Sequence, residues 1–423
     1  MKRICVVFGV CWALGGEVHA DVYSALRRVY DSNPVIGQGR SAVDAAHADV
    51  KGATTGFQPY LGLVGNAGVA RTKIDEYTFD YSPLQYGVEF QQNLFQGGAN
   101  LASFKAAKGN LVAERANLYA TEQEVFLNAI NAYIEVLNAK EVLALNQNNK
   151  KVLAEYYALV RDRQKVGMLT RTDVAQADAR LEMAKYGLVD AQAKYENALE
   201  TFVRIYGEAE AEYEDIDLEP VGHLFPQTID DAEEYAMRQH PVLIALEARE
   251  KATKQNIVVA YQSLLPSVDV RGAIQQIDDV PYLDDVRDSR VGIYLKVPLY
   301  DKGNAFANSD KVRAKVAGIE EQIVNTRRII TENLRIAWNM YDAQGAAVQA
   351  AGASVKANQM ALNGIKDEQA RGRRTVLDVL NAEQELLNSQ VAQVRARHAR
   401  VSAYFSVLSA MGLLTPENLN LGD

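Results

Sequence analysis

Two threonine–aspartate pairs are the residues of this chain whose types and spacing indicate a specific chemistry. Thr170 and Asp173 lie three residues apart, and Thr375 and Asp378 repeat the pair 205 positions later. This spacing is the pattern of a capping box, in which each side chain accepts a hydrogen bond from the other residue's backbone N–H at the start of a helix. The pattern predicts a helix start at each pair, with a carboxylate at the positive helix end.

No constellation typical of an enzyme accompanies these pairs. The histidines after residue 20 are His47, His223, His240 and His398, which are scattered and lack the spacing of a metal site. The sequence also contains no Gly-rich phosphate loop and no nucleophile elbow. We therefore expect no enzymatic activity, no cofactor and no metal.

The two pairs belong to a duplication that runs the length of the chain. The segment GMLTRTDV at 167–174 returns as GRRTVLDV at 372–379. A period this long indicates one large unit that was copied once, rather than a solenoid. The predicted parts are a first repeat at 21–207, an acidic linker at 208–229, a second repeat at 230–412 and a tail at 413–423.

Residues 1–20 have the features of a secretory signal peptide. Lys2 and Arg3 precede an apolar run over 4–14 that is too short to cross a bilayer. Both cysteines of the chain lie inside this segment, so the exported part would contain no thiol. With 45 basic and 54 acidic residues the formal charge is −9, and the absence of a basic stripe argues against nucleic acid as a partner.

Long stretches without proline predict long helices. Proline is absent between Leu84 and Glu219 and between Leu299 and Thr415, and these stretches are rich in Ala, Leu, Glu and Gln. From Val174 onward an apolar column and an alanine column recur every seven residues, which is typical of coiled-coil packing. The longest helix would measure about 100 Å. The predicted helices cover about 34–55, 98–163 and 171–206 in the first repeat and about 241–262, 304–366 and 375–410 in the second.

Each repeat also contains a predicted strand hairpin, at about 58–96 and about 265–300. Leu84, Tyr86, Val88 and Phe90 alternate with polar residues or glycine, and the second hairpin alternates in the same way. This period of two indicates strands with one apolar and one polar face. The polar, acidic segments at 72–82 and 276–290 are interpreted as the loops that join the strands.

The strand count suggests that several chains assemble. No segment after the signal is apolar over about 18 residues, so membrane insertion would have to use strands. Four strands cannot close a barrel, because about eight are needed. Three copies would supply twelve. The same alternation also fits a half-buried sheet in a protein outside the membrane, which remains the alternative.

Together with the strand-to-helix segments at 92–98 and 297–303 and the turns at 166–174 and 371–386, these features make the chain resemble the TolC family of Gram-negative outer-membrane export channels. The resemblance implies a mostly α fold with a small β part. Long antiparallel coiled-coil helices would form an α-barrel in the periplasm, and four strands per chain would join a trimeric 12-stranded transmembrane β-barrel.

The resemblance also implies function and partners. The channel would be the passive exit duct of a tripartite export system, for either type I protein secretion or multidrug efflux. Its partners would be two further copies of itself, outer-membrane lipid, a periplasmic adaptor protein, and an inner-membrane ABC exporter or proton-driven pump. The rival hypothesis is an exported coiled-coil scaffold or surface-fibre subunit without a channel.

Roles for the turn residues follow from the same resemblance. Asp378 falls where the family places an acidic ring at the tunnel constriction, and Asn381 stands where a second aspartate can occur, so cation selectivity would be weaker. Contacts that hold the tunnel closed would involve Thr172, Asp173 and Arg374, with an Asp173–Arg374 pair as the specific hypothesis. Gln369 belongs to the same set of gating positions but stands where a tyrosine can sit, so one contact would be missing or replaced. Adaptor docking would involve Gly167, Thr170, Gly372 and Thr375. Ordinary helix capping is the alternative explanation for both aspartates.

Overall fold

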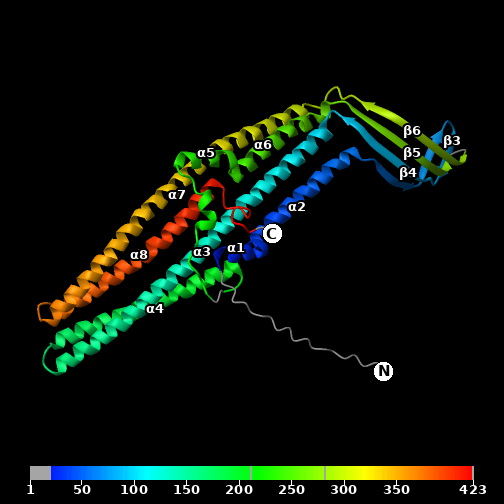
Figure 1. Ribbon diagram of the computed structural model, residues 1–423. Coiled ribbons are helices and arrows are strands. Elements are labelled where there is room, and N and C mark those ends of the chain that lie inside the picture. Colours follow the sequence, from blue (N-terminus) through cyan, green and yellow to red (C-terminus); the bar gives the residue numbers. More distant parts are fainter. Residues whose placement is uncertain (1–20, 210–211, 281–282, 422–423) are drawn as a thin grey trace, which may run out of the picture. The chain divides into compact units, whose positions relative to one another are not determined.

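The computed structural model describes residues 21–209, 212–280 and 283–421, so the predicted signal peptide lies outside the described residues. The helices are α1 (Val22–Ser32), α2 (Pro34–Thr54), α3 (Ala99–Lys165), α4 (Arg171–Tyr206), α5 (Ile229–Gln239), α6 (Pro241–Ala260), α7 (Asn304–Ala370) and α8 (Val376–Met411) (Figure 1). The strands are β1 (Tyr60–Ala67), β2 (Ala70–Ile74), β3 (Tyr77–Tyr81), β4 (Leu84–Gln96), β5 (Ser267–Val280) and β6 (Leu283–Lys296). Short 3-10 helices lie at Thr55–Phe57, Glu219–Leu224 and Gln262–Leu264.

The predicted long helices are confirmed, and their lengths repeat. Helices α3 and α7 each contain 67 residues without interruption, and α4 and α8 each contain 36. Within the described residues, no helix is both long enough and apolar enough to cross a membrane.

Two short helices, α1 and α5, one in each repeat, were not predicted from the sequence. The start of α5 has the same threonine–aspartate spacing as the two predicted capping boxes, here at Thr228 and Asp231. The Thr228 hydroxyl accepts a hydrogen bond from the backbone N–H of Asp231 at 3.2 Å. This capping pattern was available in the sequence and would have indicated α5.

The chain divides into two compact units, and neither coincides with a sequence repeat. One unit comprises the described residues up to Pro34, Glu122–Ala232 and the described residues from Asn333 onward. The other comprises Val35–Thr121 and Glu233–Glu332. Because α3 and α7 each contribute to both units, each repeat supplies part of each unit.

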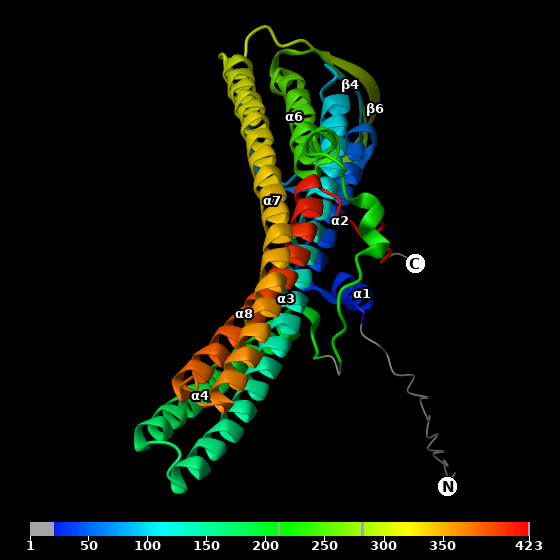
Figure 2. The ribbon, with the colours of Figure 1, turned by 60° about the vertical axis from the view of Figure 1, so that its left-hand side comes forward.

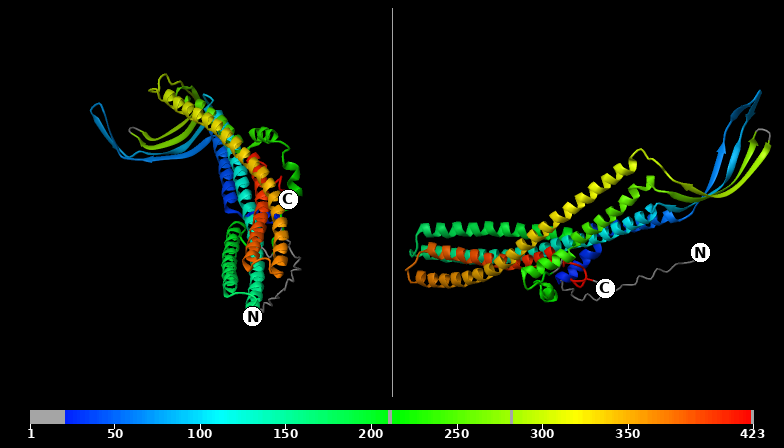
Figure 3. Two further views of the ribbon diagram at one scale, coloured as in Figure 1. Left: turned by 90° about the vertical axis from the view of Figure 1, so that its left-hand side faces the viewer. Right: turned by 90° about the horizontal axis from the view of Figure 1, so that it is seen from above.

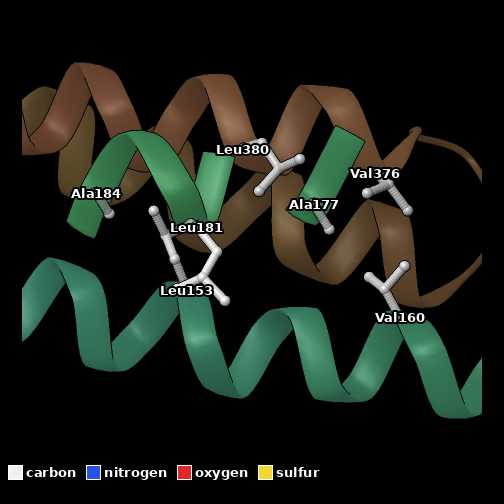
Figure 4. Close-up of a cluster of buried hydrophobic side chains, with 7 residues drawn as sticks. All are labelled: Leu153, Val160, Ala177, Leu181, Ala184, Val376 and Leu380. Atoms are coloured by element: carbon white, nitrogen blue, oxygen red, sulfur yellow. The ribbon is translucent and has the colours of Figure 1, made fainter. Parts of the chain in front are cut away.

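The first unit packs α4 and α8 against the C-terminal part of α3 through one apolar cluster. Figure 4 shows the seven buried side chains of this cluster gathered in the space between the three helices. They are Leu153 and Val160 from α3, Ala177, Leu181 and Ala184 from α4, and Val376 and Leu380 from α8. The predicted alanine column of α4 therefore lies at the interface, where small side chains let helices approach closely.

Helix α8 also packs against α7, beside which it lies in Figures 1 and 2. Leu362 of α7 forms a second buried cluster with Val379 and Leu386 of α8. Tyr156 of α3 is partly buried and packs against both this cluster and the first one. The two coiled-coil pairs of this unit thus share a continuous apolar contact.

Aromatic side chains anchor the acidic linker at 208–229 to the first unit. Tyr213 meets Phe202 of α4 edge to face, with ring centroids 5.2 Å apart. Phe225 stacks on Tyr404 of α8, with centroids 4.5 Å apart. Such pairs are worth about 0.5–1.5 kcal/mol beyond the area that they bury. The described part of the linker is therefore packed against the helices.

The second unit contains a four-stranded antiparallel sheet in the order β1-β4-β5-β6. Strands β4 and β5 come from different repeats and pair in the centre, so the duplicated halves meet inside one sheet. Strands β2 and β3 form a separate hairpin that extends from the end of β1 and β4 farther from α2 and α6 (Figure 3).

The prediction of two joining loops was wrong for most of their length. Residues 72–82 contain the end of β2 and all of β3, which pair from Ala70 with Tyr81 to Ile74 with Tyr77. Most of 276–290 belongs to β5 and β6. Polar side chains do not prevent pairing where both faces of a hairpin are open to solvent, so polarity alone gave the wrong assignment.

We predict that Gly109→Leu destabilises the second unit. A Cβ at Gly109 of α3 would lie 2.9 Å from the Cβ of Ala252 on α6, so a larger side chain must push the helices apart. Overpacking of this kind costs about 1–3 kcal/mol. Thermal unfolding followed by circular dichroism should show a lower Tm.

The matched control is Gly318→Leu in α7, because a Cβ there meets no heavy atom within 4 Å. Both substitutions gain the same helix propensity, so the difference between them isolates the contact. Equal Tm values for the two variants would contradict the proposed close approach of α3 and α6.

Candidate functional site

The candidate site consists of two equivalent helix-to-helix turns in the first unit. Helix α3 ends in a Schellman motif: the N–H of Met168 donates to the carbonyl of Arg163 at 2.9 Å, and the N–H of Gly167 donates to Gln164 at 2.9 Å. Gly167 has a φ of 77°, which glycine adopts without strain. The motif reverses the chain within a few residues, so that α4 runs back beside α3.

The second turn repeats this geometry 205 residues later. The N–H of Arg373 donates to the carbonyl of Glu368 at 2.9 Å, and the N–H of Gly372 donates to Gln369 at 3.0 Å. Gly372 has a φ of 73°. At both turn glycines a Cβ would meet no heavy atom within 4 Å. Backbone conformation, and not crowding within this chain, accounts for glycine at both positions.

Both predicted capping boxes are present. The Thr170 hydroxyl accepts from the N–H of Asp173 at 3.2 Å, and Asp173 Oδ2 accepts from the N–H of Thr170 at 2.9 Å. The second turn shows the same contacts, at 3.1 Å to the Thr375 hydroxyl and 2.9 Å to Asp378 Oδ2. Each aspartate thus satisfies a backbone donor that a helix start would otherwise leave without a partner.

Asp378 carries a stabilised negative charge. Its carboxylate accepts hydrogen bonds from the backbone N–H of Thr375 and from the Thr375 hydroxyl at 2.8 Å. These bonds, together with the nearby positive charge of Arg374, lower the pKa of Asp378 below its ordinary value of 3.8. The side chain is half-buried and is ionised at neutral pH.

Asp173 and Arg374 are each engaged within their own turn. The Arg374 guanidinium donates to Glu368 Oε2 at 2.8 Å, and the Asp173 carboxylate is held by Thr170. The hypothesis of an Asp173–Arg374 pair therefore stays a prediction. Thr172 is exposed, and Gln369 is half-buried and supplies only its carbonyl to the turn.

Sequence reasoning missed a direct polar contact between the two coiled coils. Arg180 of α4 donates to Asn381 Oδ1 of α8 at 2.7 Å. Asn381 had been identified from the sequence, but which residue of α4 faces it depends on how the helices pack. A second contact, between Lys366 of α7 and Glu383 of α8 at 2.6 Å, joins the helices of one coiled coil.

Tyr156 is the other site residue that the sequence did not reveal. Its hydroxyl is buried beside the apolar cluster of α3, α4 and α8 and has no hydrogen-bond partner in the described part of the chain. Burial raises the pKa of Tyr156 to about 12, so the phenol is protonated at neutral pH. A single tyrosine in a helix rich in apolar residues carries no sequence signal that separates it from the core.

Comparison with known proteins places the chain in a family. The sequence model of the family described as "Outer membrane efflux protein" matches residues 25–208 and 234–413. The chain is 29% identical over 404 residues to the outer membrane efflux protein BepC of Brucella suis, covering 94% of this chain and 86% of that protein. It is 24% identical over 441 residues to the outer membrane protein TolC of Escherichia coli, covering 99% and 88% respectively.

The fold agrees with these sequence matches. The structure of the Campylobacter jejuni CmeC outer membrane channel superposes with a TM-score of 0.81 at 17% identity, covering 95% of this chain and 90% of that one. The chain belongs to the outer membrane efflux protein family. It is a Gram-negative outer-membrane export channel, which confirms the class indicated by the paired turns and the duplicated helices.

We predict that Arg180 and Asn381 stabilise the contact between α4 and α8 together. Arg180→Ala and Asn381→Ala should each lower stability, and the double variant should lose less than the sum, with a coupling of about 0.5 kcal/mol for a partly exposed contact. The measurement is a double-mutant cycle by chemical denaturation.

Asn388 provides the matched control, because this α8 asparagine bonds to Gln384 rather than to Arg180. The cycle of Arg180→Ala with Asn388→Ala should show no coupling. Equal couplings for the two asparagines would mean that the Arg180–Asn381 contact does not form in solution.

Proposed function

We propose that three copies of this chain assemble into the passive exit duct of a tripartite export system. Their sheets would pool twelve strands into one transmembrane barrel, and their helices would form the tunnel wall. A periplasmic adaptor protein and an inner-membrane ABC exporter or proton-driven pump would complete the system and supply the energy. The duct itself would have no enzymatic activity.

The observation that carries this proposal is an exposed apolar face on a sheet with two open edges. The strand register aligns Leu63, Val88 and Ile274 in one row and Leu61, Phe90 and Val291 in the next. Leu63 is 86% exposed and Val291 is 79% exposed. Apolar surface of this extent indicates contact with lipid or with another protein.

The opposite face of the sheet is polar. Glu89 lies in one row with Arg290, and Gln91 lies in the next with Arg271. A sheet that is apolar on one side and charged on the other fits a barrel wall between lipid and a water-filled lumen.

The edges explain why more than one chain would be needed. β1 pairs only with β4, and β6 pairs only with β5, so one side of each edge strand lacks backbone partners within the described sheet. Unpaired backbone groups cost several kcal/mol each in a bilayer. Pairing β1 of one copy with β6 of the next removes both edges, and three copies reach twelve strands.

The two helix-to-helix turns support the roles proposed for ion selectivity and adaptor docking. Three Asp378 carboxylates around one axis would form an acidic ring that attracts cations. Asn381 would add no charge to this ring, and in this chain its side chain is already bonded to Arg180. The adaptor would dock at the exposed turn backbone around Gly167, Thr170, Gly372 and Thr375, whose turn glycines leave the backbone accessible.

Disulfide formation between edge strands tests the assembly. Strands β1 and β6 are separated by two strands of their own sheet, about 14 Å, which is beyond the reach of a disulfide. We predict that a cysteine at Leu63, combined in turn with a cysteine at each β6 position from 291 to 295, gives covalent trimers on non-reducing gels in at least one combination.

Each single-cysteine variant serves as the control and should stay uncrosslinked, because both natural cysteines lie within the first 20 residues. Growth of the ladder beyond three copies would mean an open filament. Absence of any crosslink, in a protein that shows no conductance in planar bilayers, would support the scaffold hypothesis instead.

Ion selectivity tests the role of Asp378. We predict that Asp378→Asn lowers the potassium-over-chloride preference of the channel at least about twofold, because a ring of carboxylates favours cations. The lowered pKa of Asp378 means that the wild-type preference holds above pH 3.8 and falls only as the pH drops further and the carboxylate gains a proton. The measurement is the reversal potential in a salt gradient as a function of pH.

Asp215→Asn removes the charge of an exposed linker residue and should leave the reversal potential unchanged. If Asp378→Asn behaves like this control, Asp378 acts as a helix cap and not as a selectivity residue.

A further inference from the structure

The second unit contains a polar cavity where the sheet meets α6 and α7. Its volume is about 720 Å³, and its walls include the end of β6, the adjacent residues after α6, and one face of α7. Figure 1 shows α6 and α7 side by side next to the helix-proximal ends of β5 and β6. Neither the duplication nor the family resemblance assigns a role to this cavity.

Three lysines line the cavity. Lys311 and Lys315 are one turn apart on α7 and so share a face, and Lys296 is the last residue of β6. None of the three ammonium groups forms an ion pair with a carboxylate in the part of the chain that the structure describes. This local excess of positive charge lies in a chain whose formal charge is −9.

Neutral hydrogen-bonding groups also line the cavity, beside apolar residues such as Val259 and Val312. Gln96, Ser267 and Lys296 form one row across β4, β5 and β6, because Gln96 pairs with Ser267 and Ser267 pairs with Lys296. Asn256 and Asn308 add amide groups from α6 and α7. A cavity with several ammonium donors and neutral polar groups is suited to an anion that carries several oxygen acceptors.

Two acidic side chains near the cavity are engaged in hydrogen bonds of their own. Asp301 accepts a hydrogen bond from the Ser263 hydroxyl at 2.6 Å and from the N–H of Ala305 at 2.7 Å at the start of α7. Asp269 is buried and accepts from Asn93 at 3.0 Å. Neither carboxylate belongs to the cavity lining, so neither neutralises the lysines there.

The sheet register indicates which side of the wall the cavity faces. The row of Gln96, Ser267 and Lys296 lies on the same face of the sheet as Arg271, which is the polar face. Val268 and Leu295 lie on the opposite, apolar face. A lipid headgroup would approach from the apolar side. The polar side is the lumen under the proposed function, on which this part of the inference rests.

We propose that Lys296, Lys311 and Lys315 form a binding site for phosphate-bearing or similarly multivalent solute anions on the luminal wall of the duct. In a trimer the site would occur three times around the lumen. It would concentrate anionic solutes at the entrance to the barrel and would oppose the cation preference expected from Asp378. Affinity would be modest and would fall with ionic strength, because the ammonium groups are exposed to water.

Pyrophosphate binding to the purified protein in detergent micelles, measured by isothermal titration calorimetry at low salt, tests this site. The double variant Lys311→Gln/Lys315→Gln should bind about a hundredfold more weakly, on the basis of about tenfold for each lost charged hydrogen bond. Lys296→Gln should weaken binding about tenfold. Lys251→Gln on α6 is the control, because this exposed lysine does not line the cavity, and it should bind like the wild type.

Equal affinities for the wild type and the double variant, or no binding by the wild type, would overturn the proposal. Anionic lipid in the micelles distinguishes the two sources of phosphate: competition by phosphatidylglycerol comparable to that by pyrophosphate would assign the site to headgroups and refute the luminal assignment. The cavity lies within one chain, so binding by a protein that fails to form trimers would retain the site and reject the duct. A conducting trimer that binds no pyrophosphate would support the duct and reject the anion site.

Discussion

The requirement that every backbone N–H and C=O find a hydrogen-bond partner shapes the small β part of this protein. Four antiparallel strands pair in the order β1-β4-β5-β6, which satisfies the central strands and leaves each outer strand half satisfied. The same sheet presents a band of exposed apolar side chains on one face. In water such a sheet would aggregate, and in a bilayer its edges would be intolerable. Pooling of strands among copies, as proposed, removes both difficulties at once.

The helical part obeys a second requirement, which is that a helix must have its terminal groups satisfied where it stops. The chain reverses its direction at the end of each 67-residue helix. Both reversals consist of a Schellman motif followed by a threonine–aspartate capping box. These turns keep the paired helices in register, so that the alanine column of α4 meets the facing helices. The residues proposed for docking and selectivity are therefore also structural, and substitutions must be interpreted with matched controls.

The two groups of residues proposed to face solutes, one in each unit, carry opposite charges. In the first unit, two hydrogen bonds from Thr375 stabilise the Asp378 carboxylate and lower its pKa. In the second unit the cavity lysines have no carboxylate partner among the described residues. If both proposals hold, each sign of charge would meet one favourable and one unfavourable section along the duct, which would weaken its overall charge selectivity.

The sequence by itself determined the long helices, the two strand-containing segments and the resemblance to a family of export channels. Proline-free stretches, heptad columns and two capping boxes gave the long helices, because these signals are local or repeat at a fixed period. The internal duplication supplied each of these signals a second time. Local polarity misled at 72–82 and 276–290, where pairing between strands overrode it.

Only the tertiary structure decided which residues face one another. Asn381 was visible as a polar residue near Asp378, but its contact with Arg180 depends on how α4 packs against α8. The lysine cavity combines residues of β6 and α7 with residues near α6, and no spacing in the sequence connects them. Contacts between segments far apart in the chain follow from packing geometry, which a linear pattern does not contain.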